Sequence, residues 1–67
     1  MVEVGAIYKH YKGHIYKVLA MAKHSETLED MIVYEGAGGD VWCRPAHMWN
    51  ELVNGKPRFE KIVDEGN

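Results

Sequence analysis

The chain has 67 residues, 46% of them hydrophobic, and its eight basic and ten acidic residues give a net charge of -2. This length allows one small domain, and the apolar content excludes the disordered class, in which low hydrophobicity and high net charge prevent collapse. The slightly acidic balance excludes a basic footprint over the whole domain, so any nucleic-acid role requires a local patch.

The N-terminal third predicts a β-hairpin. Residues 6–11 are rich in aromatic and β-branched types, residues 12–14 supply a turn centred on glycine, and residues 15–22 are again strand-like. Regular alternation of the second strand puts one set of side chains on a single face, namely Tyr16, Val18, Ala20 and Ala22. Because the other face is also partly apolar, we expect this strand to bend between two packed layers.

The middle of the chain predicts two more strands. After residue 23, Ser25 is suited to cap a short helical turn that runs to Asp30, and Thr27 is an equally good cap for a tighter one. Residues 31–35 form the third predicted strand, residues 36–40 a glycine-rich hairpin loop, and residues 41–44 the fourth strand.

The C-terminal third predicts one helical turn and one strand. Pro45 suits the first position of an α or 3₁₀ turn over residues 45–50, which would carry Met48 and Trp49 inward. The pair Asn54-Gly55 marks a tight turn, and residues 58–62 form the last strand.

Together these elements predict an all-β fold, a small SH3-like antiparallel β-barrel of about five strands with one short helical or 3₁₀ turn before the last strand. An OB-like barrel is the second choice. We expect a single domain over residues 1–67, with an ordered core at about 5–63 and a tail at 64–67.

Several short blocks, in order along nearly the whole chain, resemble DUF1653, a family of small bacterial and phage proteins of unknown function. The blocks are Tyr8-x-His10-Tyr11-Lys12-Gly13, Tyr16-x-Val18, Ala22-x-His24-Ser25-Glu26-Thr27-Leu28-Glu29, Val33-Tyr34, Trp42-x-Arg44-Pro45, Met48 and Pro57-Arg58-Phe59. The resemblance implies a compact SH3-like barrel and no established activity. The sequence departs from the family in two places. The loop at residues 36–40 is short and glycine-rich where members often have a longer, more apolar segment, and Trp49 stands where Phe is common.

Polar and aromatic side chains outside the predicted core form the candidate binding set. They are His10, Tyr11, Lys12, His24, Ser25, Glu26, Thr27, Trp42 and Arg44. One interpretation is a binding patch in which an aromatic face stacks a planar ligand while a guanidinium pairs with a carboxylate or phosphate. The other is structural, with the block at residues 24–27 capping a turn. His10 and His24 fall at opposite ends of a simple hairpin, so the sequence leaves open whether the set shares one surface.

Metal binding and catalysis have weaker support. Cys43-x₃-His47 resembles half of a zinc site, but the chain has one cysteine and no second close pair of ligands. No phosphate-binding loop, nucleophile elbow, dinucleotide-binding motif or calcium loop occurs. A free cysteine in a strand is usually a buried small hydrophobe, and so small a domain has little room for a pocket of about 300 Å³. We expect no catalytic residue, no metal and no cofactor.

The sequence therefore predicts a non-catalytic binding module for a peptide, a protein or a single-stranded nucleic acid. Four lysines and no acid among residues 6–25 make the first hairpin locally basic and favour an acidic partner. The alternative is a small-molecule or anion-binding domain with hydrolytic chemistry around His24, Glu26 and Arg44. A lone cysteine, no apolar run of about 20 residues and no signal-peptide pattern favour a cytoplasmic monomer or small oligomer with no membrane partner.

Overall fold

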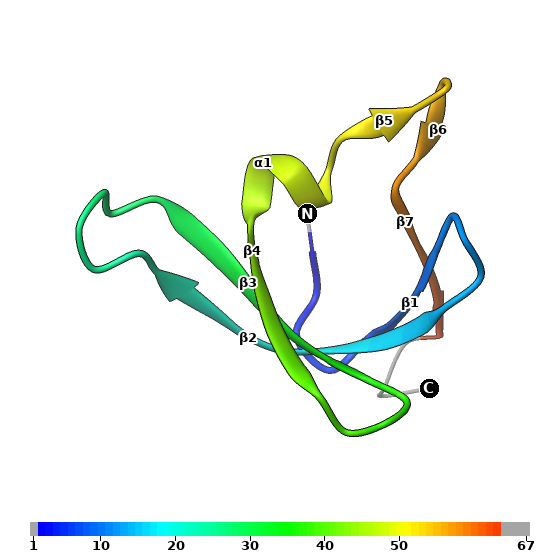
Figure 1. Ribbon diagram of the computed structural model, residues 1–67, viewed down its shortest axis with the longest axis horizontal. Coiled ribbons are helices and arrows are strands. Elements are labelled where there is room, and N and C mark those ends of the chain that lie inside the picture. The colour runs from blue at the N-terminus through cyan, green and yellow to red at the C-terminus, as the bar shows by residue number, and fades with distance from the viewer. Residues whose placement is uncertain (1, 64–67) are drawn as a thin grey trace.

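Five antiparallel strands form one curved sheet in the computed structural model, which describes residues 2–63 (Figure 1). The strands are β1 (Ile7–His10), β2 (Ile15–Lys23), β3 (Asp30–Gly36), β4 (Val41–Pro45) and β7 (Phe59–Val63). Their order across the sheet is β4-β3-β2-β1-β7, so β4 and β7 form its two edges. The prediction of an all-β antiparallel fold with about five strands is confirmed.

The chain between the last two strands of the sheet adds a helical turn and a small hairpin. The turn α1 (Ala46–Trp49) follows β4 directly, and β5 (Leu52–Val53) pairs with β6 (Lys56–Pro57). The predicted helical turn is thus confirmed, as is the tight turn at Asn54-Gly55, where both residues have positive φ. The two-residue strands that flank this turn were missed, because two residues are too few to show periodicity. The predicted tail at residues 64–67 lies outside the described residues.

The core lies on the concave, inner face of the sheet, where large rings pack beneath α1. Its buried side chains are Ala6, Tyr8, Val18, Ile32, Tyr34, Trp49 and Phe59. Trp49 stacks on Phe59 with ring centroids 3.7 Å apart and planes 4° apart. Tyr8 and Tyr34 meet the Trp49 ring edge to face at 5.4 and 4.9 Å. α1 therefore closes the concave side by inserting Trp49, as the sequence predicted, whereas Met48, also predicted to point inward, is half-buried and is not among the described side chains that pack on the core.

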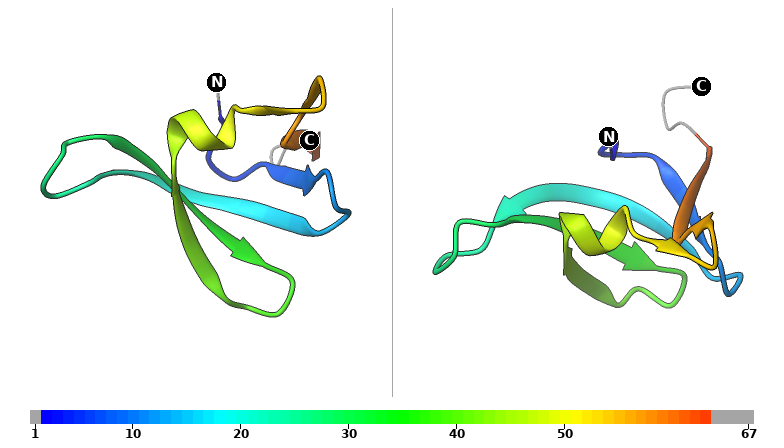
Figure 2. Two further views of the ribbon diagram at one scale, coloured as in Figure 1. Left: turned by 45° about the horizontal axis from the view of Figure 1, so that its top comes forward. Right: turned by 90° about the horizontal axis from the view of Figure 1, so that it is seen from above.

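A β-bulge in β2 makes the simple alternation expected for this strand wrong beyond Val18. Val18 pairs with Tyr34, but the next regular partners are Ala20 with Val33 and Met21 with Ile32, so two residues of β2 oppose one of β3. Directly opposed residues share a face, so Met21 rather than Ala20 joins the inner face. A bulge increases local twist, and Figure 2 shows β7 standing steeply above the plane of β2 and β3.

The expectation that the cysteine is buried is wrong, because Cys43 lies on the outer face of the sheet. Cys43 pairs with Val33 across β4 and β3, and its side chain is exposed rather than buried. It lies on the outer face because its neighbours Trp42 and Arg44 alternate onto the inner one. No element packs on this part of the outer face within residues 2–63, so β4 is covered on one side only.

Candidate functional site

Four rings form a band across the inner face, which we call the aromatic strip: Trp42, Tyr16, His10 and Tyr11. Strand register places Tyr16 and Trp42 there, because Tyr8 pairs with Tyr16, Tyr16 with Gly36, and Tyr34 with Trp42. Alternation along β1 places His10 on the same face as Tyr8, and Tyr11 follows in the turn after β1. His10 lies 6.5 Å from Tyr16 and 4.5 Å from Tyr11, measured between ring centroids. The rings at the two ends of the strip are the exposed ones, with 48% of Tyr11 and 53% of Trp42 accessible.

A notch interrupts the strip at Gly36 in β3. A methyl group on Gly36 would lie 3.3 Å from Cε1 of Tyr16 and 3.9 Å from Nε1 of Trp42, so these two side chains converge on the glycine. The missing side chain lets both rings lie close to the backbone of β3. Tyr16 and Trp42 therefore meet over the backbone of β3 at Gly36.

Cationic groups lie beside both halves of the strip. Arg44 follows Trp42 on the inner face, donates from Nε to the Tyr34 hydroxyl at 3.5 Å, and places Cζ 5.8 Å from the centroid of Phe59. At the other end, Nζ of Lys12 lies 5.9 Å from the centroid of Tyr11. Since no carboxylate forms an ion pair with either residue among residues 2–63, the strip carries positive charge available to a ligand.

His10 is held in place by its neighbours. Its Nδ1 accepts a hydrogen bond from the Lys12 N–H at 3.1 Å, and its ring meets Phe59 edge to face at 4.9 Å. Burial lowers the pKa of His10 below its ordinary value of 6.5, and the charges of Arg58, Arg44, Lys12 and His14 lower that pKa further. His10 is therefore a neutral, hydrogen-bonded ring at neutral pH.

The lowered pKa of His10 predicts a loss of stability on acidification. The folded state resists protonation that the unfolded chain accepts near pH 6.5, so this contribution is complete above pH 6.5 and is lost as the pH falls below it. Urea unfolding between pH 8 and pH 5 should show a smaller decline for His10→Asn, whose amide oxygen can replace Nδ1 as acceptor, than for the wild type. His14→Asn, at an exposed position of the β1–β2 turn, should retain the wild-type decline. Parallel curves for His10→Asn and the wild type would contradict this assignment.

The block at residues 24–27 forms the turn between β2 and β3, and His24 caps it. Nδ1 of His24 accepts hydrogen bonds from the N–H groups of Glu26 and Thr27 at 3.1 and 3.3 Å, and Oγ1 of Thr27 accepts one from Glu29 at 3.3 Å. The turn is not a helix, and the predicted cap Ser25 makes none of these bonds. The structural interpretation of the block thus describes the observed contacts, with histidine in the place expected for serine.

The structure brings together one half of the predicted set and leaves the other apart. Phe59 meets the His10 ring edge to face at 4.9 Å and its centroid lies 5.8 Å from Cζ of Arg44, so these two residues lie near the same ring. Trp42 shares the inner face with Arg44, and Tyr11 stays near His10. The 24–27 turn lies at the far end of the β2–β3 hairpin, on the left of Figure 1. Within residues 2–63, its hydrogen bonds and ion pairs do not reach Arg44 or Trp42.

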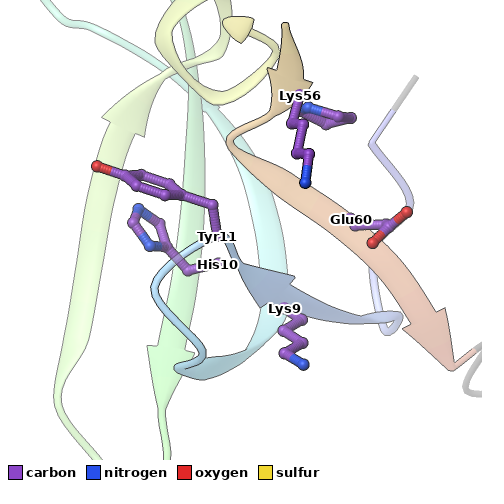
Figure 3. Close-up of a pocket in the computed structure, with 6 residues that line it drawn as sticks. Lys9, His10, Tyr11, Lys56 and Glu60 are labelled. Atoms are coloured by element: carbon purple, nitrogen blue, oxygen red, sulfur yellow. The ribbon is translucent and has the colours of Figure 1, made fainter. Parts of the chain in front are cut away.

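Several residues of the strip and its surroundings were not in the predicted set. Tyr16 and Gly36 enter through strand register, and four further side chains join His10 and Tyr11 around a pocket of about 480 Å³, namely Lys9, Lys56, Pro57 and Glu60 (Figure 3). A pocket of this size was not expected in so small a domain. It exists because the β5–β6 hairpin stands above the end of β1, and nothing local in the sequence specifies that placement.

Metal-ligand and membrane-spanning features were also assessed within residues 2–63. No three histidine, cysteine, aspartate or glutamate side chains gather there closely enough to hold a metal ion. The one helix in this part of the chain has four residues, and none there is long and apolar enough to cross a bilayer.

Comparisons with known proteins identify relatives without a known activity. A family model described as "Protein of unknown function (DUF1653)" matches residues 6–61. The crystal structure of a DUF1653 protein from Bordetella bronchiseptica is similar, with a TM-score of 0.80 and 33% sequence identity. That similarity covers 91% of this chain and 88% of the other. No curated protein matches the chain.

Proposed function

The chain belongs to the DUF1653 family, and from its own surface we propose that it is a non-catalytic module that binds single-stranded nucleic acid along the aromatic strip. The observation that carries this proposal is the exposure of two rings, Tyr11 and Trp42, at the ends of a band of aromatic side chains flanked by unpaired cations. Single exposed apolar side chains are common on proteins, but rings that gather on one surface beside cations are typical of an interaction site.

Base stacking is the interaction that such rings provide. Every base presents a π-face, and stacking on an aromatic side chain contributes about 1 to 3 kcal/mol per base with little sequence preference. Trp42 offers the larger ring, and Tyr16 lies beside it over Gly36. Bases splayed across the strip would place the linking phosphates toward Arg44 and Lys12.

Charge favours nucleic acid over a peptide at this surface. Aromatic grooves also bind proline-rich peptides, which require no cations. Here Arg44 and Lys12, which flank the strip, form no ion pair within residues 2–63, and burial, together with the charges of both, lowers the pKa of His10. With a net charge of -2 over the whole chain, this local field should support modest, strongly salt-dependent binding.

Small-molecule hydrolysis around His24, Glu26 and Arg44 has less support. The Nδ1 atom of His24 already accepts two backbone hydrogen bonds, and within residues 2–63 the hydrogen bonds and ion pairs of its turn do not reach Arg44. A general base must lie within hydrogen-bonding reach of the proton it removes, and no shared position for a substrate links these groups.

Titration of ¹⁵N-labelled protein with a short single-stranded oligonucleotide tests the proposal. We expect chemical-shift changes at Tyr11, Tyr16 and the indole N–H of Trp42, while the indole N–H of buried Trp49 changes little. The affinity should fall steeply between low and physiological salt as counterions compete for the cations. A proline-rich peptide and a duplex of the same sequence serve as comparisons. Shifts at the strip with the peptide and none with the oligonucleotide would identify a peptide module instead.

A further inference from the structure

The pocket of about 480 Å³ lies where the end of β1 meets the β5–β6 hairpin, and it gathers groups from distant parts of the chain. Lys9, His10 and Tyr11 come from β1 and the turn after it, Lys56 and Pro57 form β6, and Glu60 belongs to β7 (Figure 3). The rings of Tyr11 and His10 form one wall, and the ammonium group of Lys56 points into the space between Tyr11 and Glu60.

Two of the lining residues are lysines without a carboxylate partner. Lys23 and Arg58 form ion pairs of 2.6 and 2.7 Å with Asp30 and Glu51, whereas neither Lys9 nor Lys56 forms an ion pair within residues 2–63. Glu60 pairs with Lys9 in the strand register, yet no ion pair joins their side chains. The pocket thus holds two ammonium groups against one carboxylate, a net charge of one positive unit.

The pocket lies beside one end of the aromatic strip, and His10 and Tyr11 line both. Strand register puts Lys9 and Glu60 on the opposite face from His10 and Phe59, so a strand that stacks on Trp42 and Tyr16 reaches the pocket by passing around the end of β1 at Tyr11. Nδ1 of the neutral His10 ring accepts a hydrogen bond from the Lys12 N–H, so the proton of the imidazole lies on Nε2. Nε2 is therefore a hydrogen-bond donor. The end of the strip therefore offers cations and an N–H donor in a hollow, whereas its middle offers flat rings.

We propose that this pocket binds the terminal phosphate of the single strand that occupies the strip, an inference that rests on the proposed function. A terminal phosphomonoester carries about 1.5 to 2 negative charges and three acceptor oxygens, against one charge on an internal phosphodiester. Lys56 points its ammonium group into the hollow and Lys9 lines its edge, and this cationic lining matches the larger charge of the monoester better. Glu60 opposes the phosphate, and its side chain limits how tightly the pocket holds it.

Fluorescence anisotropy with three versions of one oligonucleotide tests this assignment: a 5′-phosphate, a 3′-phosphate, or hydroxyl groups at both ends. One phosphorylated version should bind about fivefold more tightly than the hydroxyl version, the effect typical of an exposed charge pair. Lys56→Gln should abolish that advantage and leave the affinity for the hydroxyl version unchanged. Glu60→Gln should have the opposite effect and increase the advantage of the phosphorylated oligonucleotide.

Lys23→Gln is the matched control, because it removes the same charge at the far end of the β2–β3 hairpin and should keep the full advantage. Equal affinities of wild-type protein for all three oligonucleotides would overturn the terminal-phosphate assignment and leave the proposed function intact. Loss of the advantage in Lys23→Gln as well as in Lys56→Gln would also overturn it, because net charge would then explain the effect. No binding of any version would remove the proposed function itself.

Discussion

Replacement of Trp49 by alanine is expected to lower the free energy of unfolding by about 3 to 5 kcal/mol. Trp49 is 2% exposed, stacks on Phe59 at 3.7 Å, and is the residue by which α1 closes the concave face. Its removal leaves a cavity bordered by Tyr8 and Tyr34 that a rigid ring cluster cannot refill. A domain of this length has roughly 3 to 10 kcal/mol of total stability, so much of the variant should be unfolded at room temperature.

Urea denaturation followed by far-ultraviolet circular dichroism measures this loss, and the second tryptophan provides the control. Trp42→Ala makes the same chemical change at a position that is 53% exposed, and we expect it to cost less than about 1 kcal/mol. Similar losses in the two variants would show that α1 does not close the core through Trp49.

The same Trp42→Ala variant is expected to lose about tenfold to hundredfold in affinity for single-stranded oligonucleotides, the equivalent of one stacked base. Because the side chain lies outside the core, the variant should remain folded, so the loss can be assigned to binding. Trp42→Phe should recover part of the affinity, since a smaller ring still stacks.

Anisotropy titrations at low salt measure this effect, with Val41→Ala as the matched control. Val41 precedes Trp42 in β4, is 57% exposed, and points to the outer face opposite Glu35. The Val41→Ala variant should bind oligonucleotides with the affinity of the wild type. Equal weakening by Val41→Ala and Trp42→Ala, or no weakening by either, would contradict stacking on the strip.

Elements whose signals are local could be predicted from the sequence. Gly13 takes a φ of 102° in the β1–β2 turn, and Asn54-Gly55 takes positive φ in the β5–β6 turn, as their residue types require. The helical turn after Pro45 followed from the fixed φ of proline. Exposure of Tyr11 and Trp42 was also predicted and is confirmed, because so many rings cannot all fit inside a small core.

Features that depend on pairing across the sheet could not be predicted. The bulge after Val18 adds one residue to β2 relative to β3, and alternation within one strand cannot detect a mismatch with another. Contact of His10 and Arg44 through Phe59 joins three segments that are remote in sequence. The cap on the 24–27 turn was predicted at Ser25 or Thr27. Thr27 does accept a hydrogen bond from the Glu29 N–H, but His24 takes the position expected for Ser25, because an imidazole nitrogen can replace the serine oxygen as acceptor.

When a strand gains or loses a residue, the local twist and the face to which the following side chains point usually change together. At the bulge in β2 the twist can change while the side chains keep their faces. Deletion of Leu19 would restore regular pairing while Val18 and Met21 kept their present partners, Tyr34 and Ile32, so each would still point to the same face. The local twist would decrease, which would change the angle between β4 and β1 and therefore the spacing of Trp42 and His10. One residue at the bulge thus sets the spacing of these rings without contributing a side chain to the strip.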